Sequence, residues 1–96
     1  MTGYTLTPAA QDDLDGIWDY TAATWGEEQA VRYLEGLRDA CRELARGERQ
    51  SRPVDVRAGY RKCQVGRHVL YFRTADTGGI VVVRILHQRM DVSRHL

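Results

Sequence analysis

The chain has 96 residues, of which 43% are hydrophobic and 28% are charged. Its length suits one domain covering residues 1–96, and its composition is that of a globular protein rather than a disordered one. No apolar run approaches the ~20 residues that a membrane-spanning helix needs, and the N-terminal segment lacks the basic and apolar regions of a signal peptide. These features exclude a membrane protein and predict a cytoplasmic one.

The formal net charge of +1 conceals an uneven distribution of charge along the chain. Residues 1–28 contain six acidic and no basic residues, whereas the remainder contains seven acidic and 14 basic residues, 13 of them arginine. Because a guanidinium group can bind a carboxylate or phosphate through two hydrogen bonds, this excess favours a basic face for an anionic partner. The alternative explanation is a codon bias towards arginine and a surface that is merely solvated.

Two helices are predicted after a short β-prone segment at residues 4–6. Thr7 can cap the first helix, Pro8 suits its first turn, and apolar residues then recur at helical spacing. Gly26 ends this helix, and the second is expected from about Glu27 to Arg46. Since one glycine separates them, the two helices should form an antiparallel hairpin.

Strands are predicted after a polar loop at residues 47–55. Segments 58–64 and 68–74 are joined by a tight turn, and a glycine-rich turn leads to segment 80–86, whose sequence IVVVRIL indicates a strand buried on both faces. The order β-α-α-β-β-β predicts an α+β fold, with the helical hairpin packed on a small antiparallel sheet and the first strand at a sheet edge. A short helical turn is expected in the tail from residue 87. One core is expected to hold Leu14, Ile17, Leu34, Leu37, Leu44, Val69, Val83 and Ile85.

Cysteine and histidine residues give no sign of a disulfide, metal or cofactor site. Cys41 and Cys63 are expected to be buried thiols, since disulfides are rare in the cytosol. The three histidines lack paired-ligand spacing, so neither a metal nor any other cofactor is expected.

Three segments carry the most specific pattern of the sequence: DLDGIWDYTAATWG, VRAGYRKCQVGRHVLYFR and VVRILHQRMDVSRHL. In this order they resemble the first helix of ParE-type toxins, their Arg-x-Gly-Tyr-Arg strand with the following Gly-x-His turn, and their Arg-x-Leu-His-x-x-Met-Asp ending. The chain is therefore similar to the ParE branch of the RelE/ParE toxin superfamily over almost its whole length.

The resemblance implies the toxin of a type II toxin–antitoxin system, a class of system associated with plasmid or genome stabilisation. Such a toxin is expected to inhibit DNA gyrase without catalysis and to form a hetero-oligomer with a ParD-like antitoxin, a ribbon–helix–helix protein whose C-terminal segment folds on binding. The alternative is a RelE-like, metal-independent and ribosome-dependent messenger RNA endoribonuclease, although Lys62 is the chain's only lysine and that branch is lysine-rich. A non-toxic family member kept for interaction is a third possibility.

The toxicity surface is predicted to be Arg61, Arg84, His87, Arg89 and Met90. A gyrase inhibitor would use these residues for contacts alone, whereas a nuclease would use Arg61, Arg84 and His87 in catalysis, with His87 as a general acid or base. Arg84 interrupts an apolar strand, so its charge must reach solvent, bind an anionic partner, or pair with an aspartate of the first helix.

The antitoxin-binding residues are predicted to be Trp18, Trp25, Tyr33, Arg57 and Arg73. The aromatic residues of the helices either pack internally or form an apolar groove, and a chain this short cannot bury all of them. An acidic and apolar antitoxin segment is expected to lie across the hairpin and the arginine-bearing sheet.

Overall fold

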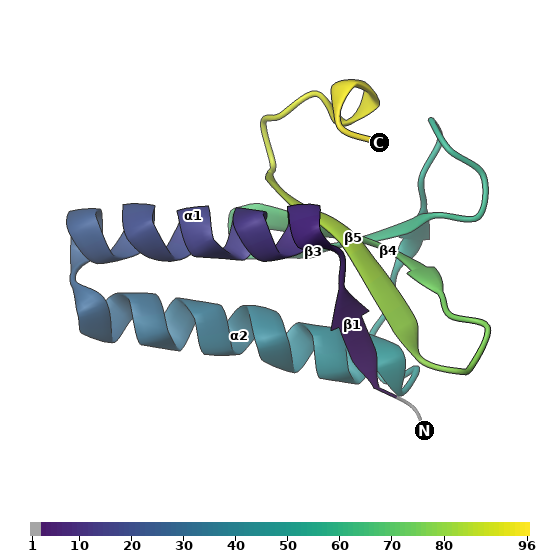
Figure 1. The fold of residues 1–96 in the computed structure, drawn as a ribbon, viewed down its shortest axis with the longest axis horizontal. Coiled ribbons are helices and arrows are strands. Elements are labelled where there is room, and N and C mark those ends of the chain that lie inside the picture. Colours follow the sequence, from purple (N-terminus) through teal and green to yellow (C-terminus); the bar gives the residue numbers. More distant parts are fainter. Residues whose placement is uncertain (1–2) are drawn as a thin grey trace.

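The computed structural model describes residues 3–96 and consists of a helical hairpin packed on a five-stranded sheet (Figure 1). The hairpin contains helices α1 (Pro8–Trp25) and α2 (Glu27–Ala45), which run antiparallel as predicted. The sheet contains β1 (Tyr4–Leu6), β2 (Arg52–Pro53), β3 (Arg61–Val65), β4 (His68–Thr74) and β5 (Ile80–His87), and a short 3₁₀ helix, η1 (Val92–Arg94), follows. The predicted α+β class and the helical turn in the tail are confirmed.

The sheet is mixed rather than antiparallel. Its strand order is β1-β5-β4-β3-β2, and β1 runs parallel to β5 at the edge while the other neighbours are antiparallel. The edge position of β1 was predicted correctly, but the prediction of an antiparallel sheet is wrong for this strand. Strand β2 was also missed, because only two residues of the predicted loop pair with β3.

The helices begin and end at capping residues, and those of α1 are the ones that the sequence predicts. The backbone N–H of Ala10 donates to the Thr7 hydroxyl over 3.1 Å, and the same hydroxyl donates to the Val83 carbonyl over 2.8 Å, which ties the start of α1 to β5. Gly26 and Gly47 adopt φ values of +94° and +73° where α1 and α2 end. Both termini therefore use a backbone conformation that costs other residues free energy.

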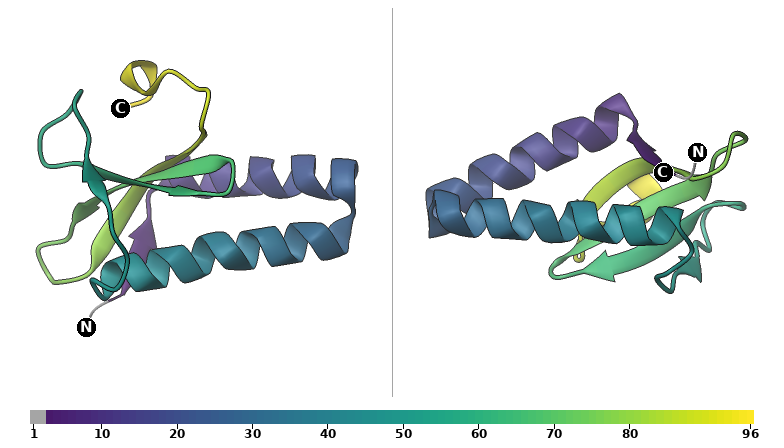
Figure 2. Two further views of the ribbon diagram at one scale, coloured as in Figure 1. Left: turned by 180° about the vertical axis from the view of Figure 1, so that it is seen from behind. Right: turned by 90° about the horizontal axis from the view of Figure 1, so that it is seen from below.

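The core is divided between the two faces of the sheet, so the prediction of one shared core is only partly correct. Six of the predicted core residues pack together between the hairpin and the sheet: Leu14, Ile17, Leu34, Leu37, Leu44 and Ile85. Val69 and Val83 instead pack on the opposite face around Tyr71 and Leu86, where Val92 and Leu96 of the tail also lie. Figure 2 shows α2 and the tail on opposite sides of the sheet.

The alternation of side chains along a strand explains this division. On β4, Leu70 and Phe72 face the helices, so their neighbours must face away from them. On β5, Val83 is an extra residue at a β-bulge, between the pairs Tyr71–Arg84 and Phe72–Val82. A simple two-residue period cannot place a bulged residue.

Two further features of the fold concern the cysteines and the character of the helices. Cys41 and Cys63 are free and buried, as predicted, and burial raises the pKa of the Cys41 thiol to about 11. Within residues 3–96, no helix combines the length and apolar character needed to span a membrane.

Candidate functional site

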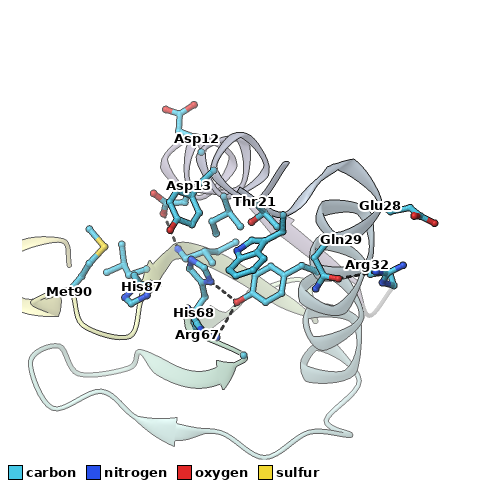
Figure 3. A pocket seen from close by; sticks show the side chains of 18 residues that line it. Asp12, Asp13, Thr21, Glu28, Gln29, Arg32, Arg67, His68, His87 and Met90 are labelled. Atoms are coloured by element: carbon cyan, nitrogen blue, oxygen red, sulfur yellow. Dashed lines mark hydrogen bonds between the residues drawn. The ribbon is translucent and has the colours of Figure 1, made fainter. Parts of the chain in front are cut away.

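An open groove of about 930 Å³ lies between the helical hairpin and one end of the sheet (Figure 3). Helices α1 and α2 form one side, and the β3–β4 turn, the start of β4 and the end of β5 form the other. We call it the hairpin groove, and its main lining residues are Asp13, Ile17, Tyr20, Trp25, Arg32, Tyr33, Gly66, Arg67, His68, Ile85, Leu86, His87 and Met90. Its volume is on the scale of sites that bind another molecule.

The helical wall of the groove combines polar and charged residues with exposed aromatic side chains. Tyr20 is 69% exposed and Trp25 is 65% exposed, whereas Ile17, which also lines the groove, is buried in the core. Met90 is 44% exposed at the opposite rim. Exposed aromatic residues around a concave surface are typical of sites that bind another molecule.

A polar cluster of Tyr33, His68 and His87 forms the floor at the sheet end. The Tyr33 hydroxyl lies 2.6 Å from Nδ1 of His68 and accepts a hydrogen bond from the Arg67 backbone N–H over 3.1 Å. The rings of His68 and His87 meet edge to face with their centroids 5.5 Å apart, and the same centroid distance separates Tyr33 from His68. The cluster links α2 to the paired ends of β4 and β5 (Figure 3).

Glycine at position 66 permits this close approach. Gly66 has φ +58°, and a Cβ atom there would lie 2.8 Å from the Tyr33 ring. A side chain at this position would therefore force either the Tyr33 ring or the β3–β4 turn to move. The glycine lets the Tyr33 hydroxyl reach the turn.

The surroundings of His68 favour its neutral form by lowering its pKa. Burial lowers its pKa, the neighbouring His87 lowers it further, and the negative charge of Asp13 acts in the opposite direction. In the tautomer whose Nδ1 carries no hydrogen, neutral His68 can accept a hydrogen bond from the Tyr33 hydroxyl.

An ion pair joins the groove wall to β5. Asp13 of α1 accepts two hydrogen bonds from the Arg84 guanidinium, at 2.8 Å from Nε and 2.9 Å from Nη2, and a third from the Ile85 backbone N–H at 2.9 Å. These contacts raise the pKa of Arg84. The alternative prediction that Arg84 pairs with an aspartate of the first helix is therefore confirmed.

The predicted toxicity residues do not form one surface. His87 and Met90 line the hairpin groove, and the exposed Arg89 donates its backbone N–H to Nδ1 of His87 over 3.2 Å. Arg84 is engaged in the ion pair beside β5. Arg61 lies two strands away on β3, where its guanidinium donates to the hydroxyl and carbonyl of Ser51 over 2.7 and 2.8 Å.

The predicted antitoxin-binding residues are also divided. Trp25 and Tyr33 line the hairpin groove, but Trp18 packs against the core and borders a separate hollow of about 240 Å³ between the helices. Arg57 lies 4.6 Å from the ring centre of Tyr60 and donates to the Leu96 carbonyl over 3.2 Å, which holds it beside the tail. Arg73 is exposed on β4 and does not line the groove.

Most groove residues were absent from the predicted site, and four of them are Ile17, Tyr20, Arg67 and His68. A signal for His68 existed in the predicted hairpin. Pairing segment 68–74 with segment 80–86 through its turn brings His68 to within one residue of His87, which is its partner in the structure. The other three depend on how the helices lie over the sheet, which strand patterns do not specify.

Comparisons with known proteins give one consistent result. The profile of the family described as "ParE toxin of type II toxin-antitoxin system, parDE" matches residues 4–92. The chain is 49% identical to Toxin ParE1 of Mycobacterium tuberculosis, over 97% of this chain and 96% of the relative. It is 37% identical to Toxin ParE1 of Caulobacter vibrioides, over 100% of this chain and 99% of the relative.

A solved structure shares the fold. The structure described as the chromosomal ParDE TA system from P. aeruginosa matches with a TM-score of 0.76 and 23% sequence identity, covering 91% of this chain and 96% of that chain. At this identity the likeness supports the arrangement of helices and strands alone.

Proposed function

Because the chain belongs to the ParE toxin family of type II toxin–antitoxin systems, we propose that it inhibits DNA gyrase and that a ParD-like antitoxin neutralises it. The observation that carries this proposal is the match to the parDE toxin profile over residues 4–92, together with 49% identity to a ParE1 toxin. The proposed toxin is a cytoplasmic binding protein, and its toxicity depends on contacts rather than on chemistry.

The distribution of the arginines supports inhibition over ribonuclease activity. A metal-independent nuclease on this chain would need Arg61, Arg84 and His87 to converge on one phosphate. Instead, Arg84 is bound to Asp13 beside β5, and Arg61 is bound to Ser51 near the opposite edge of the sheet. His87 faces a groove that neither guanidinium lines.

Two assays on the purified chain separate the functions. We expect the chain to block supercoiling by purified gyrase and to leave messenger RNA intact in a translating extract. The His87→Gln variant should retain most of the growth arrest, whereas loss of a general acid or base would reduce cleavage ~10²–10⁴-fold. Fragmented message with unaffected gyrase would replace this proposal with the nuclease, and inactivity in both assays would indicate a non-toxic family member.

The hairpin groove is the proposed site for the antitoxin's C-terminal segment. Its exposed aromatic residues suit the apolar face of a segment that folds on binding. Arg32 and Arg67 border the groove, and no carboxylate within residues 3–96 forms an ion pair with either one. The expected segment therefore combines apolar anchors with acidic residues.

Substitution of one exposed aromatic residue tests this placement. Trp25→Ala should weaken antitoxin binding by about 2 kcal/mol, the usual scale of an aromatic anchor in an interface. Val56→Ala is the control, because Val56 is similarly exposed (51%) but does not line the groove. Equal affinities for both variants would place the antitoxin elsewhere.

A further inference from the structure

The histidine pair on the groove floor is arranged so that a proton is poorly accommodated. The Tyr33 hydroxyl lies 2.6 Å from Nδ1 of His68 and accepts the Arg67 N–H, and it donates its only proton to His68 in the tautomer whose Nδ1 carries no hydrogen. If His68 gains a proton at Nδ1, the Tyr33 hydroxyl must turn and donate elsewhere. The other nearby acceptor is the Val65 carbonyl, at the longer distance of 3.4 Å.

The charges around the pair do not compensate for an added proton. Asp13 is the acidic group that favours protonated His68, but its carboxylate already accepts three hydrogen bonds and is neutralised by Arg84. A proton on His87 would repel a proton on His68, since the rings are in edge contact. The remaining charged or titratable groups of the lining are Asp12 and Tyr20 on α1, Glu28, Arg32 and Tyr33 on α2, and Arg67 on the β3–β4 turn.

An apolar partner in the hairpin groove would add to these effects. His68 and His87 are each only partly exposed, so a segment packed over them would remove their remaining contact with water. Loss of water disfavours the charged form of an imidazole. A partner carboxylate has Arg32 and Arg67 available as partners, and these stay charged throughout the titration range of histidine.

We infer that the hairpin groove binds its partner only when the His68–His87 pair is neutral, so that partner binding releases protons and mild acid loosens the complex. This inference rests on the proposed function, since the partner is the antitoxin segment. It makes the affinity of the groove for its partner depend on pH, because two histidines of this chain would lie against the bound segment.

The test compares affinity at two pH values for matched histidine variants. The probe is the full-length ParD-like antitoxin of the proposed function, titrated calorimetrically at about pH 7.5 and about pH 5.5. We expect wild-type affinity to fall ~3-fold to ~20-fold at the lower pH through this linkage. His68→Gln and His87→Gln should each reduce this loss of affinity at the lower pH. The double variant should abolish the part of the loss that comes from titration of this chain.

His95 supplies the matched control because it lies in the tail and does not line the groove. His95→Gln should keep the full wild-type pH dependence. Any part of this dependence that comes from titration of the antitoxin is the same for all variants, so differences between variants belong to this chain. Thermal melts check that each variant folds. Titration of wild type in two buffers of different ionisation enthalpy counts the protons released on binding near pH 6, which requires no variant.

The outcomes distinguish the inference from its premise. Absence of binding at both pH values would overturn the proposed antitoxin and the linkage together. Binding with the same affinity at both pH values, binding that tightens in acid, or a pH dependence unchanged in the double variant would overturn the linkage alone. Proton release that disappears in the double variant and persists in His95→Gln would establish it.

Discussion

Removal of the Asp13 carboxylate should destabilise the fold far more than removal of the neighbouring Asp12 carboxylate. In Asp13→Ala, three hydrogen bonds are lost, and the Ile85 backbone N–H is left without an acceptor inside the core. The ion pair is largely buried, with side-chain exposures of 14% for Asp13 and 24% for Arg84. An unsatisfied buried N–H costs ~1–3 kcal/mol, and breaking a fully buried pair costs ~3–5 kcal/mol.

The expected loss for Asp13→Ala is about 2–4 kcal/mol, because Arg84 retains some access to water and can be solvated when its partner is removed. For a domain of this size, that loss corresponds to a fall in melting temperature of very roughly 10–25 °C. Asp12→Ala is the control: Asp12 is exposed, and no ion pair involving it occurs within residues 3–96. Its expected effect is within about 0.5 kcal/mol.

Urea unfolding followed by circular dichroism measures both variants under the same conditions. A double-mutant cycle with Arg84→Met separates the pair from the Ile85 hydrogen bond, since the coupling energy contains only the interaction between the two side chains. If Asp13→Ala were as stable as Asp12→Ala, the carboxylate would not hold α1 to β5 as the distances indicate. A coupling energy near zero would assign the loss to the backbone N–H alone.

Three further predictions concern a turn, a thiol and a histidine. Gly66→Ala should lower the free energy of unfolding by ~1–2 kcal/mol in urea, because position 66 has a left-handed backbone and lies against the Tyr33 ring. The control Gly36→Ala, at an exposed position of α2, should raise the free energy of unfolding by ~0.5–1 kcal/mol. Equal effects of the two substitutions would contradict the close approach of Gly66 and Tyr33. The Cys41 thiol, with its pKa raised to about 11, should react with Ellman's reagent at about pH 8 only as the chain unfolds, and rapid native labelling would refute its burial. The pKa of His68 is lowered in the folded state, so the unfolded state binds more protons below about pH 6.5. The melting temperature should therefore fall as the pH drops below about 6.5. In His68→Gln, the melting temperature should depend less on pH over the same range.

Local patterns predicted the helices and most of the strands because their signals lie within a few residues. Thr7 caps α1, Gly26 separates the helices, and the apolar spacing defines the buried helix faces. The direction of β1 could not be predicted in the same way. Three residues fit either orientation, and the choice depends on how the helical hairpin, in which α2 returns the chain to the sheet, packs after β1 (Figure 1).

The groove was predicted only in part because its residues come from four separate segments. Trp25 and His87 carry signals of their own, an exposed aromatic residue and a histidine at a strand end. Tyr20 and Arg67 gain meaning only when the hairpin is placed beside the β3–β4 turn. The β-bulge at Val83 adds a further shift that periodicity cannot supply, and it changes which residues of β5 face the helices.

Arg84 shows why loss of toxicity in a variant does not identify a contact with the target. Replacing Arg84 leaves the Asp13 carboxylate partly buried with a backbone N–H as its remaining partner, so α1 can shift and the groove can change shape. A damaged toxin would then follow from a distorted fold even if Arg84 never touched gyrase. Arg89 carries a charge on the same chain segment, is exposed, and is free of any ion pair within residues 3–96, so its replacement changes the surface without disturbing the pair. Toxicity that depends on Arg89 therefore argues for a contact, whereas dependence on Arg84 argues first for the structure of the groove.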